Sequence, residues 1–150
     1  MKTQLKIKTL LLTNDNLEEI IEEGFLPIFI SRNLKCSELT SKYNHTPIHF
    51  HKLSPSIDLY NAWVFGSLTD EEFEEKFLDE LKNSVNPWLI YRNLDILSHL
   101  ADACGIVLLS FDNPRSYRDI VAKFLNNSLD INITEYVTNR REDMGLSSEE

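Results

Sequence analysis

One run of residues constrains the fold more than any other. Residues 104–112 read CGIVLLSFD, with no charged side chain before Asp112. A short apolar run bounded by turn signals is typical of a strand buried on both faces of a sheet. Asn113 and Pro114 follow, and the apolar residues beyond them keep helical spacing: Ile120, Val121, Phe124 and Leu125. The run therefore predicts a buried strand that leads through a turn into a helix.

Two more strands are predicted near the start of the chain. Residues 5–13, LKIKTLLLT, alternate and then become continuously apolar, and residues 25–33, FLPIFISRN, form a second apolar run. Between them, DNLEEIIEEG has an Asn/Asp cap, an acidic first turn and a closing Gly24, which are the signals of a short helix. We expect a β-α-β unit in which the two strands are parallel partners.

The middle of the chain is predicted to be helical. The Ser-Pro-Ser of residues 54–56 signals the start of one helix, and Thr69 with Glu72 forms a capping box for a second. Asn86-Pro87 begins a third. Three helices would then lie between two strands, a crossover that still permits a right-handed parallel connection.

The remaining segments complete the predicted architecture. Residues 48–53, IHFHKL, suit a short edge strand, residues 130–136, DINITEY, a final strand, and residues 34–46 a loop. The order of elements indicates an α/β fold, a three-layer, mostly parallel sheet with helices on both faces. With 150 residues, we expect a single α/β domain over residues 1–140 and an acidic tail over 141–150.

Composition limits the location and partners of the protein. The net charge of -9 argues against extended nucleic-acid binding, because such affinity comes from Lys and Arg that neutralise phosphates. No apolar run approaches the roughly 18 residues that span a bilayer, and residues 1–16 lack a signal-peptide core. We therefore expect a cytoplasmic protein without a membrane partner. Cys36 and Cys104 are expected to be reduced thiols, with Cys104 in the core.

Metal and cofactor chemistry are not expected. His49 and His51 would share one strand face, but neither they nor His45 have a cysteine or carboxylate that completes a ligand motif. The Gly-rich phosphate-binding and nucleophile-elbow motifs are absent as well. We therefore predict no metal and no cofactor.

Polar residues at the ends of two predicted strands suggest an anion site. Ligands of open parallel sheets bind beyond the carboxyl ends of the strands, where helix N-termini present free amides. Asn113 is expected to cap the helix, with Pro114 as its first residue. The candidate ligand-binding residues lie in SFDNPRSYR and at the end of the second strand: Ser110, Asp112, Arg115, Ser116, Tyr117, Arg118, Ser31 and Arg32. In the alternative interpretation, these arginines pair with surface acids.

Three segments resemble an uncharacterised prokaryotic and phage family, domain of unknown function 488. They are FLPIFISRNL, HKLSPSIDLYNAWVFGSLTDEEFEEKFLDEL and IVLLSFDNPRSYRDIVAKFL, which together cover roughly residues 24 to 136. The family typically ends its late strand in Leu-Leu-Cys-aromatic-Glu and opens the next helix with Cys-His-Arg. Here Ser110 and Asp112 stand for the Cys and Glu, and residues 116–118, Ser-Tyr-Arg, stand for Cys-His-Arg. The resemblance implies that the thiols and imidazole of the family are lost, while Arg118 is kept.

Three functions stay open at this point. The leading one is a non-catalytic binder of a small anionic or nucleotide ligand at Ser110 to Arg118. The second is an acidic protein-interaction module, such as a phage inhibitor of a host protein, whose helix over residues 69–80 engages a basic partner. The third is an enzyme acting on a nucleotide or nucleic acid through Ser110, Tyr117 or Asp112. A helix-mediated homodimer is also open, although the apolar helix faces that carry the aromatic residues Trp63, Phe65 and Trp88 are expected to serve the core.

Overall fold

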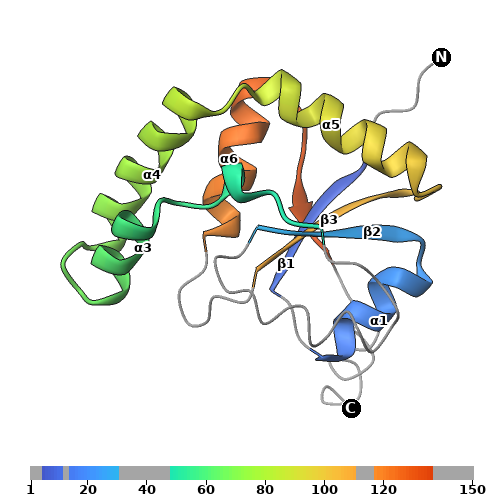
Figure 1. The fold of residues 1–150 in the computed structure, drawn as a ribbon, viewed down its shortest axis with the longest axis horizontal. Coiled ribbons are helices and arrows are strands. Elements are labelled where there is room, and N and C mark those ends of the chain that lie inside the picture. Colours follow the sequence, from blue (N-terminus) through green and yellow to red (C-terminus); the bar gives the residue numbers. More distant parts are fainter. Residues whose placement is uncertain (1–4, 12–13, 31–47, 111–116, 137–150) are drawn as a thin grey trace, which may run out of the picture.

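A parallel sheet lies at the centre of the computed structural model (Figure 1). The structure describes residues 5–11, 14–30, 48–110 and 117–136. Within these residues the sheet has four strands: β1 (Ile7–Leu11), β2 (Phe25–Phe29), β3 (Gly105–Ser110) and β4 (Thr134–Glu135). Their order is β2-β3-β1-β4, and every pairing is parallel.

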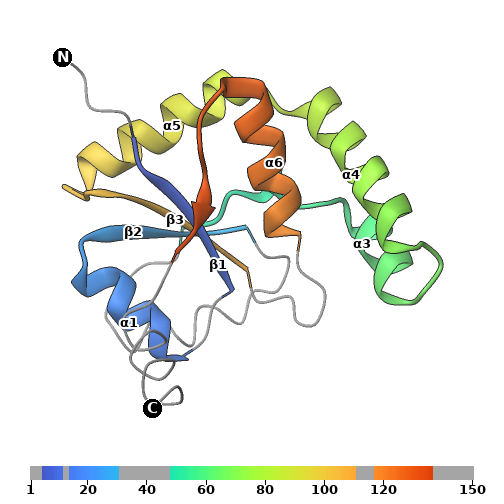
Figure 2. The ribbon, with the colours of Figure 1, turned by 180° about the vertical axis from the view of Figure 1, so that it is seen from behind.

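Helices cover both faces of this sheet. One face carries α1 (Asn14–Glu22). The other carries four helices and one 3-10 turn: α3 (Ile57–Val64), α4 (Asp70–Ser84), α5 (Pro87–Leu100), α6 (Arg118–Leu129) and η1 (His51–Leu53). Figure 2 shows the same division from behind, with α1 apart from the other helices. The predicted three-layer α/β fold is confirmed.

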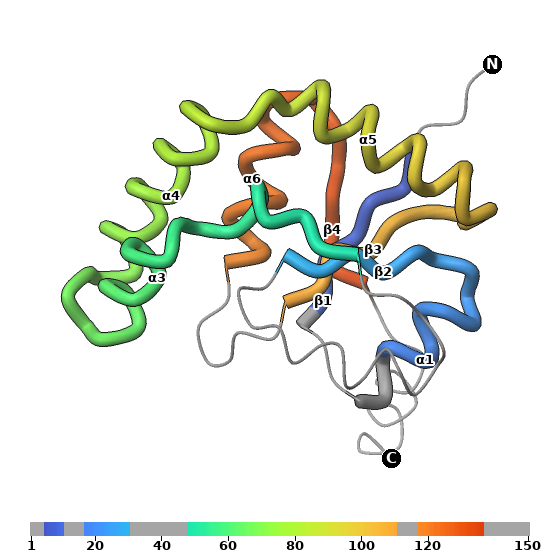
Figure 3. The backbone as a smooth tube through the Cα atoms, in the orientation of Figure 1, coloured from blue at the N-terminus to red at the C-terminus, as the bar shows by residue number. Residues whose placement is uncertain are grey.

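The connections explain why the layers are unequal. The chain passes from β1 to β2 through α1 on one face, and it returns to β3 and β4 on the other face (Figure 3). Crossovers of one hand that move in opposite directions along a sheet must use opposite faces. The expectation that β1 and β2 are neighbours is wrong, because β3 lies between them. As the most apolar strand, β3 takes a central position where both of its faces are covered.

Burial confirms the strand predicted from residues 104–112. All six residues of β3 are buried. On the four-helix face, a large cluster packs around them, with Phe73, Phe77 and Leu94 fully inaccessible. On the α1 face, the cluster is smaller and includes Leu17 and Ile20. Since burying one such side chain contributes about 1.5–3 kcal/mol, the four-helix face supplies most of the stabilisation.

The predicted helix starts are confirmed in the middle of the chain. Ser56 and Asn86 cap α3 and α5 with their side chains. At α4, the Thr69 hydroxyl accepts from the Glu72 amide at 3.1 Å, and the Glu72 carboxylate accepts from the Thr69 amide at 3.0 Å. These two bonds lower the pKa of Glu72, because they favour its charged form.

The predicted edge strand over residues 48–53 is wrong. Among the described residues, one isolated bridge, between Phe29 and His49, links this segment to the sheet, and the chain then turns into η1. The hydroxyl of Ser54 donates to the Ile30 carbonyl oxygen at 2.5 Å and fixes the end of the turn. The spacing of Phe50 and Leu53 is that of a helical turn rather than of a strand.

Two other expectations need correction. The final strand shortens to Thr134–Glu135, because Asp130 takes a left-handed conformation and the Asn126 side chain holds both backbone polar groups of Ile133. Cys104 is exposed rather than buried, since it precedes β3. None of the helices in the described parts of the chain combines the length and apolar character needed to cross a bilayer.

Candidate functional site

The carboxyl edge of the sheet has the geometry in which α/β proteins commonly bind ligands. Strands β1 and β3 are neighbours, and their onward connections leave on opposite faces through α1 and α6. Such a switch point opens a crevice beyond the strand ends. Three predicted site residues, Ser110, Tyr117 and Arg118, can be placed here. The other five lie outside the described residues: Ser31, Arg32, Asp112, Arg115 and Ser116.

Tyr117 is a core residue. Its side chain is fully inaccessible, and its hydroxyl donates to the Ile30 carbonyl oxygen at 2.5 Å. The ring packs edge-on against Tyr60 and Phe77, with centroid distances of 6.0 and 5.6 Å. The expectation that Tyr117 faces a ligand is therefore wrong in this structure. The ring joins the end of β2 to α3 and α4, which is a structural role.

Ser110 is also closed to solvent. It shares its face of β3 with Ile106 and Leu108, by strand alternation, and its exposed fraction is zero. A nucleophile has to reach its substrate, so this placement counts against the enzyme hypothesis as far as it uses Ser110 or Tyr117. The third residue of that hypothesis, Asp112, lies outside the described residues.

Arg118 follows the alternative interpretation, in which the arginines pair with acids. It is the first residue of α6, and Tyr117 takes the N-cap position that was expected for Asn113; Asn113 and Pro114 themselves lie outside the described residues. Its guanidinium group lies 3.0 Å from the Glu135 carboxylate of β4, and its side chain is only 14% exposed. The pair links α6 to the edge of the sheet and leaves Arg118 partly neutralised.

A second candidate surface lies on the outside of α4 and α5. These two helices form an arch over α6 (Figure 1). The outward side of α4 is acidic, with exposed Glu71, Glu75 and Asp79. The outward side of α5 exposes four large apolar residues: Trp88 (66%), Leu89 (52%), Ile96 (48%) and Leu100 (79%). We call these seven residues the α4–α5 ridge.

The expectation that the aromatic residues Trp63, Phe65 and Trp88 serve the core holds for one of the three. Trp63 does so, since its ring stacks on Phe73 at 3.8 Å and its indole nitrogen donates to Asp70. Phe65 and Trp88 are exposed instead. For Trp88, the physical reason is that α5 carries apolar residues on two sides, and the side with Ile90, Leu94 and Ser98 is the one buried against other described elements.

Besides Asp70 and Glu72, which bond to Trp63 and Thr69, the acids of α4 differ in their partners. Glu74 pairs with Lys123 of α6 at 3.1 Å, and Glu80 binds the Ser56 amide and hydroxyl, so both serve packing between helices. The three ridge acids form no ion pair with any other described residue.

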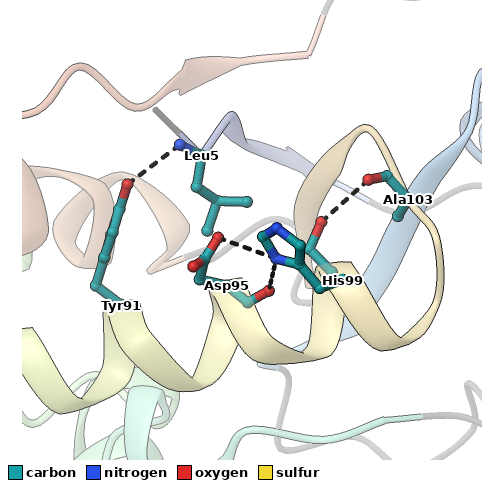
Figure 4. A network of polar contacts seen from close by, with 6 residues as sticks. Leu5, Tyr91, Asp95, His99 and Ala103 are labelled. Carbon is teal, nitrogen blue, oxygen red and sulfur yellow. Dashed lines mark hydrogen bonds and ion pairs between the residues drawn. The ribbon is translucent and has the colours of Figure 1, made fainter. Parts of the chain in front are cut away.

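On α5, the His99 ring lies 3.5 Å from the Asp95 carboxylate and 2.8 Å from the Asp95 carbonyl oxygen (Figure 4).

The histidines near β2 form a stacked pair rather than a ligand cluster. The rings of His49 and His51 lie 5.3 Å apart and almost parallel. Burial, and secondarily the neighbouring His51, lowers the pKa of His49 and favours its neutral form. Within the part of the chain that the structure describes, no group of three His, Cys, Asp or Glu side chains could hold a metal ion.

Comparisons with known proteins assign no family. The chain matches no family model, no curated protein and no solved structure. The resemblance to domain of unknown function 488 stays a prediction. What the fold defines is the class, a three-layer α/β protein with an exposed helical ridge.

Proposed function

We propose that this chain is a protein-interaction module that binds a basic partner through the α4–α5 ridge. The observation that carries the proposal is the exposure of Trp88, Leu89, Ile96 and Leu100 along one side of α5. Single exposed apolar residues are ordinary on protein surfaces, whereas several together mark a site of association. Tryptophan is also among the residues that most often dominate binding energy at protein interfaces.

The charge of the surroundings favours a basic partner. Glu71, Glu75 and Asp79 lie on the helix that leads directly into α5, and the chain carries a net charge of -9. Opposite charges around an apolar centre speed association and select the partner. A second copy of this chain would bring acid against acid, so the ridge suits a different protein. Because two helices form a convex arch, the partner should offer a groove or wrap around it.

The first test is affinity capture with matched variants. The full chain is immobilised and exposed to an extract of the cell in which it acts. We expect wild type and Phe65→Ser to retain the same basic protein, since Phe65 is 81% exposed but lies off the ridge. A variant with Trp88→Ser and Leu100→Ser should lose that protein. Equal retention by the ridge variant, or an acidic captured protein, would overturn the proposal.

The charges are tested separately. Glu75→Gln with Asp79→Asn should weaken binding of the captured protein and reduce its dependence on salt, because screening acts on exposed charges. The Glu74→Gln variant serves as the control, since Glu74 already pairs with Lys123. An affinity that is indifferent to salt and to both ridge acids would contradict the basic nature of the partner.

A second candidate function is binding of a small anionic or nucleotide ligand at the carboxyl edge. The switch point between β1 and β3 supports it, as does the position of Arg118 in the first turn of α6. A thermal-shift screen with nucleotides and phosphate should then raise the unfolding midpoint of wild type and of Arg92→Ala, but not of Arg118→Ala. If the ligand raised the unfolding midpoint equally in Arg92→Ala and Arg118→Ala, Arg118 would not belong to the site.

A further inference from the structure

Among the described elements, α1 covers part of its face of the sheet. Leu17 and Ile20 of α1 pack with Phe29 and with residues of β3. A groove of about 460 Å³ lies beside the start of β1, and no residue of α1 lines it. It is lined by residues 5–8, Phe25 and residues 131–133. Its volume lies within the range of small-molecule sites, roughly 300–1,000 Å³.

The Phe25 ring gives the groove an apolar wall. A Cβ atom at Gly105 would lie 2.8 Å from this ring and 2.7 Å from the Lys6 carbonyl oxygen, so only glycine permits this close approach. The ring also meets Tyr136 edge-on, with centroids 5.5 Å apart. Its close approach to Gly105 of β3 and its contact with Tyr136 therefore fix the position of the ring.

Two lysines give the groove a positive side. Lys8 lies on β1 and Lys6 directly precedes it, so by strand alternation both face the side of the sheet that α1 covers elsewhere. Neither forms an ion pair with another described residue. The Lys8 ammonium group donates to the Thr134 hydroxyl at 2.9 Å, which holds it beside β4.

The borders of the groove are fixed without a ligand. At one end, the Tyr91 hydroxyl accepts from the Leu5 amide at 3.1 Å (Figure 4). At the other, the Asn126 side chain holds the amide and carbonyl groups of Ile133 at 2.6 and 3.1 Å. A preformed site loses less conformational entropy on binding than one that must be ordered.

Two acids at or just after α1, Glu19 and Glu23, lie close to Tyr136. Burial, followed by the charges of Glu23 and Glu19, raises the pKa of Tyr136 to about 12, and the hydroxyl bonds to Glu19. An anionic group is repelled there and attracted by the lysines, so the charges on this face orient a ligand.

We propose that this groove binds a flat aromatic molecule that carries a phosphate group. The ring packs against Phe25, and the phosphate lies between the ammonium groups of Lys6 and Lys8. A nucleotide and a simple aryl phosphate share this chemistry. The groove is separate from the α4–α5 ridge and from Arg118. Its test therefore does not depend on either function proposed above.

Calorimetric titration of the full chain tests the proposal. The ligands are adenosine monophosphate and 1-naphthyl phosphate, with adenosine, 1-naphthol and inorganic phosphate as partial ligands. We expect at least one complete ligand to bind tenfold or more tightly than its parts. Binding of adenosine monophosphate alone would identify the ligand as a nucleotide. Binding of 1-naphthyl phosphate alone would identify it as a simple aryl phosphate. Failure of both would overturn the proposal.

Matched variants locate the site. Lys6→Gln with Lys8→Gln should weaken binding of the complete ligand at least tenfold, whereas Lys82→Gln, on α4, should not. Phe25→Leu should weaken the complete ligand but leave inorganic phosphate unchanged. Unchanged thermal midpoints confirm that the variants are folded. Loss of binding in Arg118→Ala, with retention in the lysine variant, would assign the ligand to the carboxyl edge and overturn this proposal.

Discussion

The starts of α6 and α5 each carry a large aromatic side chain, and the two lie in opposite environments. Tyr117, directly before α6, is fully buried, whereas Trp88, in the first turn of α5, is 66% exposed. Helix α6 lies against the sheet and also contacts α4 and α5. Among the described residues, helix α5 packs against α6 and β3, and its buried residues lie on one side of the helix. The layer in which a helix lies therefore decides whether its aromatic residue stabilises the fold or is available to a partner.

The number of buried residues follows from the same difference. Six of the twelve residues of α6 are buried, but only three of the fourteen residues of α5. The apolar residues on the outer side of α5 contribute little to the free energy of unfolding, because they stay in water when the chain folds. Their presence requires another explanation, and a binding surface supplies one.

Removal of the Tyr117 ring should have the largest effect. Tyr117→Ala leaves a cavity between Tyr60 and Phe77 and takes the donor from the Ile30 carbonyl group, so we expect a loss of about 3–5 kcal/mol in the free energy of unfolding. Urea denaturation measures it. Tyr117→Phe, which removes only the hydroxyl, should cost about 1 kcal/mol. If Tyr117→Ala left the free energy of unfolding nearly unchanged, the start of α6 would have to be as exposed as the start of α5.

Gly105 tests the packing of the opposite face. Gly105→Ala places a Cβ atom 2.7 Å from a backbone oxygen and 2.8 Å from the Phe25 ring, so the strand or the ring must move. We expect a loss of about 1–3 kcal/mol, as for an overpacked core, in the same denaturation experiment. A variant as stable as wild type would show that the α1 face is as adaptable as an exposed surface.

The capping box of α4 should have an intermediate effect. Thr69→Ala removes the cap and should cost about 1 kcal/mol. The folded-state pKa of Glu72 lies below its usual value of 4.5, so its stabilising contribution is complete above pH 4.5 and is lost as the pH falls through the folded-state pKa. The stability difference between wild type and Thr69→Ala should therefore shrink in acid. A constant difference from pH 7 to pH 3 would contradict this account.

Trp88 should have the smallest effect on stability. Trp88→Ser removes a mostly exposed ring, so the free energy of unfolding should change by no more than about 0.5 kcal/mol. The Trp88→Ser protein should nevertheless fail to retain the basic partner in the affinity capture. If the variant lost several kcal/mol, the outer side of α5 would have to be packed, and the contrast with Tyr117 would disappear.

Local patterns predicted much of the fold because they act over a few residues. The apolar run of β3 and the caps at Ser56, Thr69 and Asn86 have direct counterparts in the structure. The order of the strands depends on contacts between distant segments, which no local pattern contains. The absence of the expected strand near His49 has the same origin, since the Ser54 hydroxyl donates a hydrogen bond to a carbonyl group 24 residues earlier.

The candidate site was harder to predict, for a related reason. Tyr117 precedes Ile120 and Val121 by three and four residues, so it continues the buried side of α6, and this spacing was an available signal. Trp88 offered no such signal, because α5 carries apolar residues on two sides. Only the packed structure shows which side meets the sheet.

Acrylamide quenching of tryptophan fluorescence tests the central claim most directly, because the chain has only two tryptophans, Trp63 and Trp88. Trp88→Phe isolates the buried Trp63, and the difference from wild type gives the accessibility of Trp88. We expect Trp88 to be readily quenched in the free protein at every protein concentration and to become protected when the captured basic protein is added. Protection of Trp88 in the free protein, or continued quenching in the complex, would contradict it.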